Sequence, residues 1–462
     1  NTTAAIITAT SGTGGVFLTE TDGASVTAQS STGALELRNL ANTLTIGAAS
    51  GSSNGNVLIT SVDGVAINAA LDAGSGTVTI AANTDDLGAQ GFSQTTAGTI
   101  TTTYNTTGAV SITVNTTGNA GTGGAELGII TANGGSTSTI TVASHGGSIL
   151  DTDNNSALSA ATGTVALSNR VAGTGSIGTT GTATDINTTA AIITATSGTG
   201  GVFLTETDGA SFTVNATGAG AVNVNNLAGT LTIAGASGTG TGNVILDSVQ
   251  LLAINAPVSS VGGNLTLTGG TGVTHTAAGD LSVTGAGTIG VTATTGSITM
   301  ANGTVYSAET GTVILSTPGA GGGVALGRIT TTSGAVSVTA TTGNITDNTT
   351  LLDNAGNENI ATTLPGGNVT LTATAGNIGA TGVGPAIDLA LGGNFTGTSG
   401  ASAAATDGIF LNVVGAFQVG AGGINSARTI EVNATGAITN PGGAVVSLNN
   451  GDVTLDSSGA GT

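Results

Sequence analysis

The stretch NTTAAIITATSGTGGVFLTETDGAS, residues 1–25, returns letter for letter at residues 187–211. The likeness continues beyond the identical part, where Leu44-Thr45-Ile46 matches Leu231-Thr232-Ile233 with one additional residue inserted before the second copy. We place this insertion in a loop, because a slip within a strand would exchange its two faces. Self-similarity over so long a period indicates a repeat architecture.

The composition argues against ordinary globular domains. Glycine accounts for 81 of the 462 residues, aromatic residues for 2% and charged residues for only 6%, whereas a typical globular chain carries about 25% charged residues. The mean hydropathy of +0.36 also argues against a polar disordered chain. The apolar residues are mostly Ala, Val, Ile and Leu, and such small side chains predict a narrow core of uniform width.

The charge balance limits the partners of the chain. The net charge is -20, from 24 acidic residues against four basic ones, and phosphate binding requires clustered Lys or Arg. We therefore expect no nucleic-acid partner and no anionic membrane surface. No apolar run approaches the ~20 residues of a membrane helix, so we expect no membrane insertion. The absence of cysteine excludes disulfides and thiolate chemistry.

Short segments of alternating apolar and polar residues recur about every ten residues, separated by Gly, Asn, Ser and Asp. Such alternation predicts strands with one buried face, and the residues between them are turn formers. Representative segments are Val16-Phe17-Leu18, Leu35-Glu36-Leu37, Val57-Leu58-Ile59, Val78-Thr79-Ile80, Val336-Ser337-Val338 and Val453-Thr454-Leu455. The pattern predicts an all-β chain whose Val, Ile, Leu and Phe side chains point inward.

The spacing of these segments predicts a β-solenoid with about 20 residues per coil and about 22 coils. A coil of about 27 to 31 residues is the alternative that the duplication also permits. We expect one continuous domain over residues 1–462, with copies of the repeat at 1–186 and 187–about 372 and further coils over 373–462. Phe17 and Phe203 hold the same place in the two copies.

Three stretches without strand character predict protruding loops, over residues 83–94, 151–157 and 398–407. The chain opens on a repeat boundary, so we expect a processed protein or a window of a longer polypeptide. A terminal coil presents unpaired strand edges. We therefore expect each end to meet further coils of the same chain or a like subunit, end to end.

Several phrases resemble a known class of proteins. GTITTTYNTTGAVSITVNTTG (98–118), GAVSVTATTGNITDNTT (334–350), GNVTLTATAGNIGATG (367–382) and GAITNPGGAVVSLNNGDVTLDSSGAG (436–461) resemble the repeat regions of filamentous-haemagglutinin-like adhesins and other giant bacterial surface β-repeat proteins. The resemblance implies a right-handed parallel β-helix at the cell surface, acting as a stalk, fibre or adhesin. The amino-terminal secretion module of those adhesins is not visible in this sequence.

Calcium is the ion that the acidic stretches would take, and we expect no other cofactor. Asp151, Asp153 and Asn155 offer oxygens at alternate positions of one loop, without the Gly and Glu that complete an EF-hand. A second candidate site comprises Asp347, Asp353 and Glu358. The repeated pairs Glu20/Asp22 and Glu206/Asp208 form a third. For each of these sites, an ordinary solvated turn is the simpler interpretation.

Catalytic chemistry has little support in the sequence, and we expect no enzyme. Both histidines, His145 and His275, lie in Gly/Thr-rich surroundings and are expected at surface turns. The acidic pairs, such as Asp85-Asp86, have no basic residue nearby in sequence, whereas general acid–base catalysis needs a positioned partner.

The leading hypothesis is therefore an extracellular structural β-solenoid that forms a cell-surface fibre or adhesin stalk. One alternative is a β-helix that binds or cleaves carbohydrates, including host-cell or surface glycans, and a groove with three acidic residues beside an Arg would favour it. The other alternative is a subunit of a surface layer or sheath, which lateral lattice contacts would distinguish from a fibre.

Overall fold

The computed structural model describes residues 1–116, 121–169, 173–181, 184–349, 356–382, 384–401, 403 and 406–458. These residues form 48 strands and no helix, and the strands pair in parallel from one turn to the next. The parallel β-solenoid predicted from the sequence is confirmed, with about 19 turns of roughly 23 residues each. The expected coil of about 20 residues was too short, because many turns carry two short strands and an extra corner.

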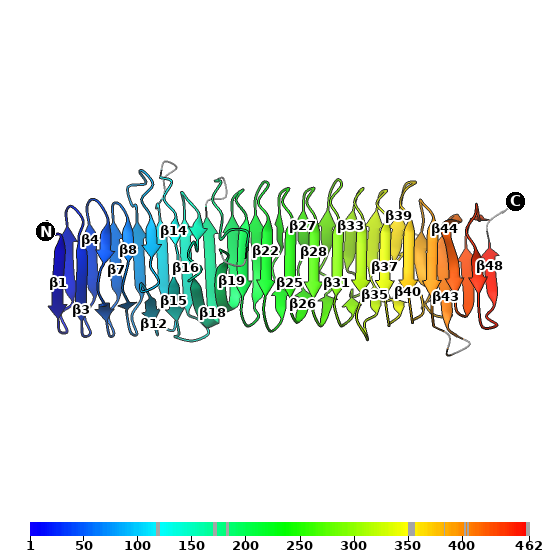
Figure 1. The fold of residues 1–462 in the computed structure, drawn as a ribbon, viewed down its shortest axis with the longest axis horizontal. Coiled ribbons are helices and arrows are strands. Elements are labelled where there is room, and N and C mark those ends of the chain that lie inside the picture. The colour runs from blue at the N-terminus through cyan, green and yellow to red at the C-terminus, as the bar shows by residue number, and fades with distance from the viewer. Residues whose placement is uncertain are drawn as a thin grey trace. The chain divides into compact units, whose positions relative to one another are not determined.

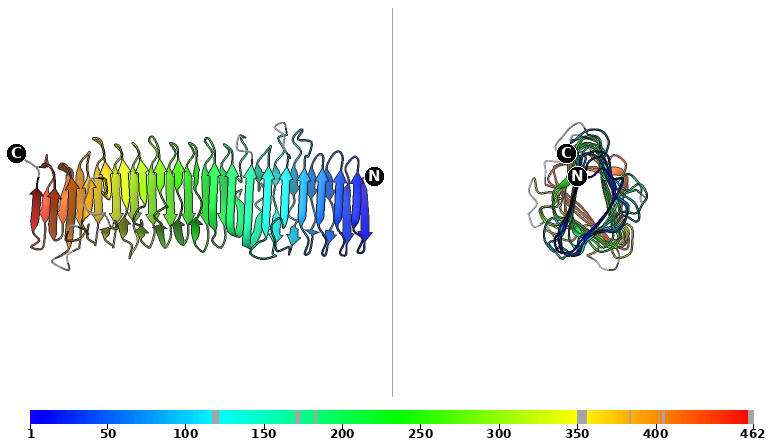
Figure 2. Two further views of the ribbon diagram at one scale, coloured as in Figure 1. Left: turned by 180° about the vertical axis from the view of Figure 1, so that it is seen from behind. Right: turned by 90° about the vertical axis from the view of Figure 1, so that its left-hand side faces the viewer.

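Contacts within the chain divide it into two compact units, Asn1–Gly229 and Thr230–Thr462. Each unit is built from two stacks of strands, which Figures 1 and 2 show lying side by side in successive turns. The single continuous domain expected from the sequence stays a prediction.

In unit 1, the first stack has one strand per turn. It contains β2 (Val16–Glu20), β4 (Leu35–Asn39), β7 (Val57–Ser61), β10 (Val78–Ala82), β13 (Val110–Val114), β16 (Thr139–Ser144), the C-terminal parts of β18 (Ala157–Asn169) and β19 (Ile186–Ser197), and β21 (Ser211–Ala216).

The second stack of unit 1 has two short strands in most of its turns. It contains β1 (Ile6–Ser11), β3 (Ser25–Ser30), β5 (Leu44–Ile46), β6 (Ser50–Ser52), β8 (Val65–Ile67), β9 (Leu71–Asp72), β11 (Phe92–Gln94), β12 (Ile100–Thr102), β14 (Ala125–Glu126), β15 (Ile129–Ala132), β17 (Ile149–Leu150), the N-terminal parts of β18 and β19, β20 (Val202–Glu206) and β22 (Val222–Asn226).

Unit 2 repeats this plan. Its first stack contains β25 (Val244–Ser248), β28 (Leu265–Gly269), β31 (Ile289–Ala293), β34 (Val313–Thr317), β37 (Val336–Ala340), β40 (Val369–Ala373), β42 (Phe395–Ser399), β44 (Phe417–Ser426), β46 (Ile438–Thr439) and β47 (Val445–Ser447). Its second stack contains β23 (Leu231–Ile233), β24 (Ser237–Thr239), β26 (Leu251–Ile254), β27 (Val258–Ser260), β29 (Gly272–His275), β30 (Leu281–Val283), β32 (Ile298–Thr299), β33 (Val305–Ala308), β35 (Val324–Leu326), β36 (Arg328–Thr331), β38 (Ile345–Asp347), β39 (Ile360–Thr362), β41 (Ile387–Ala390), β43 (Gly408–Val414), β45 (Thr429–Ala434) and β48 (Val453–Ser457).

The core of each turn follows from the alternation seen in the sequence. In β4, Leu35 and Leu37 are buried whereas Glu36 and Arg38 are exposed. Leu35 lies in register with Val57 of the next turn, so like side chains stack on one another along the core. Removing one such aliphatic side chain from water contributes roughly 1.5–3 kcal/mol.

Buried polar side chains close the corners. A Ser, Thr, Asn, Gln or His at the end of a strand bonds the carbonyl oxygen of a glycine three to five residues later, and a buried carbonyl needs such a partner. Examples are Gln94 Nε2 to Gly98 O (2.6 Å), Ser144 Oγ to Gly147 O (2.9 Å), Asn226 Nδ2 to Gly229 O (3.0 Å), Thr331 Oγ1 to Gly334 O (2.6 Å), Thr362 Oγ1 to Gly367 O (2.9 Å) and Ser447 Oγ to Gly451 O (2.8 Å). We call this arrangement the glycine corner.

The two stacks exchange their roles once within each unit. In unit 1, Ile177 and β19 together face the single strand β20, so a side with two strands per turn becomes a side with one. In unit 2, Ile378 and β41 face the single strand β43 in the same way. Each exchange is accompanied by a short excursion of the chain between the two pairing segments.

Two of the three predicted loops are shorter than expected. The stretch 83–94 ends in strand β11, and 398–407 begins with the last two residues of β42. The stretch 151–157 forms a loop up to the start of β18. Within the described residues, no helix is long and apolar enough to cross a membrane.

Candidate functional site

The loop between β17 and β18 holds the first calcium candidate, and its own donors already serve the acidic groups. Asp151 is 1% exposed, and its carboxylate accepts hydrogen bonds from Asn155 N (2.9 Å), Ser156 N (3.0 Å) and Ser156 Oγ (2.7 Å). The Asp153 carboxylate accepts one from Asn155 Nδ2 (2.6 Å). Asp151 is therefore the residue that shapes this loop.

A third acidic residue joins this loop from the preceding turn. Glu126, Asp151 and Asp153 place carboxylate oxygens within 4.8 Å of one another, the one such acidic or histidine group among the described residues. Glu126 was missed in the sequence because β14 and β17 bring it there, with Glu126 in register with Leu150. Its carboxylate accepts Thr152 N (2.5 Å) and Thr152 Oγ1 (2.8 Å). The cluster is thus tied into the loop by the protein's own hydrogen bonds.

The second calcium candidate is not assembled by the described residues. Asp347 accepts hydrogen bonds from Thr349 N (2.7 Å) and from Asn359 Nδ2 (2.7 Å). The Glu358 carboxylate accepts Gly356 N (2.9 Å), within its own turn. Asp353 lies outside the described residues.

The repeated acidic pairs differ in the two copies, although their sequences are identical. Burial raises the pKa of Glu206 to about 7, and the neighbouring Asp208 carboxyl adds to the shift. At Glu20 burial also acts to raise the pKa, but hydrogen bonds from Thr21 and Asp22 outweigh it and lower the pKa below its ordinary value. Glu206 is therefore the carboxyl that titrates near neutral pH.

One of the two histidines contradicts the expectation of a surface turn. His145 is exposed, as expected, but His275 is 6% exposed and Tyr306 is fully buried. The Tyr306 hydroxyl lies 2.7 Å from His275 Nε2, and His275 Nδ1 lies 2.8 Å from Gly279 O. His275 thus donates to Gly279 O through Nδ1 and accepts from Tyr306 through Nε2. Burial lowers the pKa of His275 to about 4, so the ring is neutral at pH 7.

His275 takes the place of a glycine-corner residue. The four-residue spacing from His275 to Gly279 equals that from Gln94 to Gly98, and both side chains bond the glycine carbonyl. The signal was present in the sequence as a polar residue at a strand end followed closely by glycine. The partner Tyr306 was not, because it comes from the neighbouring turn, through the pairing of Leu281 with Tyr306.

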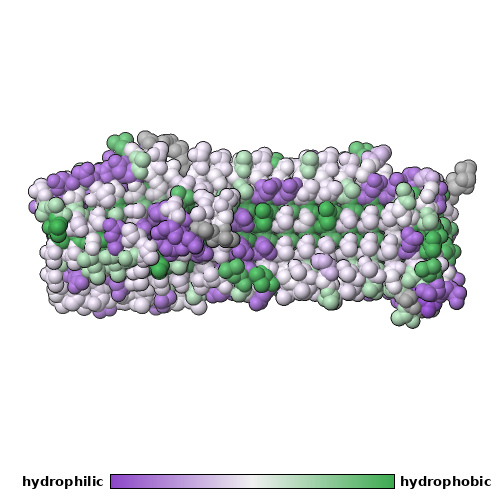
Figure 3. Space-filling view, viewed as in Figure 1, coloured by the Kyte–Doolittle hydropathy of each residue, from purple (hydrophilic) through white to green (hydrophobic). Residues whose placement is uncertain are grey.

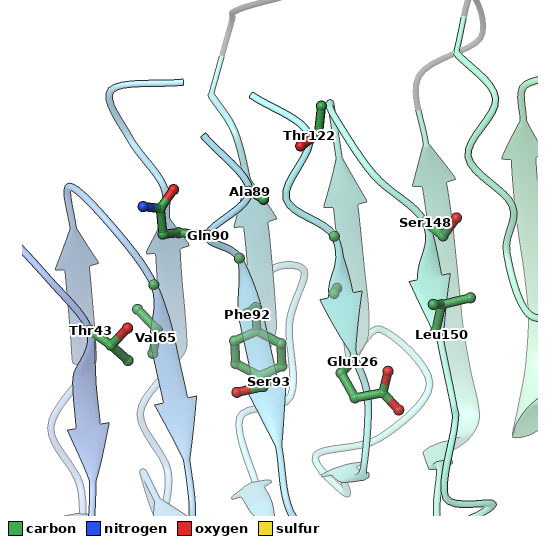
Figure 4. A pocket seen from close by; sticks show the side chains of 14 residues that line it. Thr43, Val65, Ala89, Gln90, Phe92, Ser93, Thr122, Glu126, Ser148 and Leu150 are labelled. Atoms are coloured by element: carbon green, nitrogen blue, oxygen red, sulfur yellow. The ribbon is translucent and has the colours of Figure 1, made fainter. Parts of the chain in front are cut away.

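An open groove of about 450 Å³ lies along the second stack of unit 1 (Figure 4). Its polar lining includes Gln90, Ser93, Thr122 and Glu126. Glu126 is its one acidic residue, and no Arg lines it. The groove therefore lacks the three acidic residues beside an Arg that would have favoured polysaccharide cleavage.

The phenylalanines of the duplicated stretch do not point inward, as had been expected. Phe17 and Phe203 hold the same second position of the strand VFLTE, between the inward residues of β2 and β20. Phe17 is 63% exposed and Phe203 only 7%. Both are outward residues, and what differs is whether another part of the chain covers them.

Comparison with known proteins assigns no family to this architecture. The chain matched no protein-family model, and searches of curated proteins and of solved structures also gave no match.

Proposed function

We propose that the chain is an extracellular structural β-solenoid that serves as the stalk or fibre of a bacterial surface adhesin. The observation that carries the proposal is the unbroken succession of parallel turns within each unit, each closed by an aliphatic core and glycine corners. Stability in such a fold comes from contacts between neighbouring turns, so it can be extended by adding turns.

The surface is consistent with this role. The face shown in Figure 3 consists largely of residues of intermediate hydropathy, with the hydrophilic residues gathered in patches. The acidic cluster at Asp151 is bonded within its own loop, and His275 is fixed inside the core. These groups support a structural role over a catalytic one.

The proposal includes the partner of such a stalk, which is further solenoid turns meeting the chain end to end. These turns come from a like subunit or from the same polypeptide. Parallel strands at the end of a stack offer backbone groups to any strand of matching direction.

The experiment is antibody labelling of intact cells that express the chain, followed by electron microscopy of the purified protein. Antibodies are the suitable reagent because the chain contains no lysine for amine-directed surface labels. We expect labelling of intact cells and linear assemblies in the micrographs. Labelling that requires permeabilised cells, or turnover of a polysaccharide by the purified chain, would refute the proposal.

A further inference from the structure

Two loops of the chain adopt the same geometry at the two places where the stacks exchange their roles. The Gly178 loop (residues 178–185, described except for 182–183) joins Ile177 to Ile186, and the Gly379 loop (residues 379–386, described except for 383) joins Ile378 to Ile387. The glycines have φ values of +66° and +67°. Thr179 N donates to Thr184 O and Ala380 N donates to Pro385 O, both at 2.9 Å.

Each loop lies against a strand that carries an outward phenylalanine. Phe203 N donates to Ile177 O and Phe410 N donates to Ile378 O, both at 2.8 Å. Phe410 is 1% exposed, as thoroughly buried as Phe203. Next to Phe203, Thr205 Oγ1 donates to the Asp185 carboxylate at the end of the Gly178 loop.

Only glycine fits at the start of these loops. A Cβ on Gly379 would lie 2.5 Å from Phe410 O, and one on Gly178 would meet Phe203 O still more closely. Both glycines also have the left-handed backbone that other residues adopt at a cost. The pairing of a Gly loop with an outward Phe strand is therefore a specific recognition, used twice within this chain.

The strand β2 presents the same surface without this cover. Its sequence VFLTE is that of β20, and Phe17 Cε2 lies 3.0 Å from the Cβ position of Gly15, as Phe203 Cε2 lies 3.1 Å from that of Gly201. Thr2 pairs with Glu20, which is the pairing that Thr188 makes with Glu206. The ring and the flanking strand are thus already placed, yet Phe17 is 63% exposed.

We propose that the outward face of β2 around Phe17 is a docking site for a solenoid segment of the Gly178-loop type. Such a segment has an Ile, a left-handed Gly and a second Ile eight residues beyond that Gly, and it pairs in parallel with Val16–Glu20. The first Ile would accept the amide of Phe17, and the loop would cover its ring. This inference rests on the fold and on the internal duplication, so it can hold even if the fibre role fails.

The test is to supply that segment to the full chain. Residues 173–186, GTGSIGTTGTATDI, are placed directly before Asn1, in the order in which they precede Asn187. The readout is hydrogen exchange at the Phe17 amide. We expect exchange at Phe17 to slow at least tenfold, because its donor gains a carbonyl partner.

The matched control is the same extension with Gly178→Val, whose branched side chain cannot pass the facing carbonyl. This control should leave exchange at Phe17 unchanged. A free peptide of residues 173–186 should also protect Phe17 in a saturable manner, and a Phe17→Asp chain should abolish that protection. Because Phe17 is exposed, this substitution should not prevent folding.

Three outcomes would overturn the proposal. The first is an extended chain whose Phe17 amide exchanges as fast as before. The second is equal protection by the Gly178→Val extension, which would mean that any added residues shield the face. The third is self-association of the unextended chain, measured by sedimentation, that Phe17→Asp abolishes, since a second copy would then be the occupant instead.

Discussion

Replacing His275 by Gln should remove a pH dependence from the stability of unit 2 while keeping the corner bond. His275 is neutral in the folded chain because burial lowers its pKa to about 4, whereas an unfolded histidine has a pKa of about 6.5. Gln94 shows that glutamine can bond a glycine carbonyl at the same spacing. The substitution therefore deletes the titrating group and retains the hydrogen bond to Gly279.

The sign and size follow from proton linkage. The folded pKa lies below the unfolded value, so the unfolded chain binds the proton more tightly. The contribution of neutral His275 is fully present above about pH 6.5 and is lost as the pH falls towards 4. At pH 5 the loss amounts to about 2 kcal/mol, from the two pKa values and the linkage relation.

The assay is native-state hydrogen exchange at the amides of β29 between pH 7 and pH 4.5, corrected for the intrinsic exchange rate. A local readout is preferable because repeat arrays need not unfold in one step. The native chain should lose local stability across this range and His275→Gln should lose much less, with the exposed His145→Gln as control. A pH dependence that persists undiminished in His275→Gln would refute the assignment.

Three further predictions concern other elements. Glu206 has its pKa raised to about 7, so its contribution is present below the unfolded value of about 4.5 and is lost as the pH rises through 7. Glu206→Gln should therefore flatten the decline of unit 1 stability between pH 5 and pH 8 seen by hydrogen exchange, whereas Glu20→Gln should leave it. Gly379→Ala should destabilise unit 2 by roughly 1–3 kcal/mol through backbone strain and its clash with Phe410 O, measured by urea denaturation. Gly12→Ala, with nothing within 4 Å of the added carbon, should be nearly neutral. Asp151→Ala should lower the protease resistance of the 151–156 loop equally with calcium or with a chelator present, because its carboxylate serves loop amides. A loss confined to the calcium-containing sample would show that the ion, rather than the loop, is the partner.

The sequence predicted the strands well because their alternation is a local property. Val16, Leu35, Val57 and Val78 were each expected to begin an inward-facing strand, and each does so. The length of a turn was less accessible, because short strands such as β9 and β14 have only two residues. A two-residue strand leaves no periodic signal.

The candidate site could be predicted only in part. The Asp151 loop was visible as a run of acidic and amide residues, but Glu126 reaches it through pairing between turns. The same reason explains His275, whose partner Tyr306 is 31 residues away. Residues that meet through stacking carry no fixed spacing in a chain whose turns vary in length.

The exchange of stack roles in unit 1 gives the duplication a parity. Residues Val16–Glu20 lie in the first stack, whereas their exact repeats Val202–Glu206 lie in the second. A copied segment therefore reappears on the opposite side of the core, and a further copy of the same kind would return it to the original side. Lengthening by single copies alternates the side that displays a given surface, whereas lengthening by pairs preserves it.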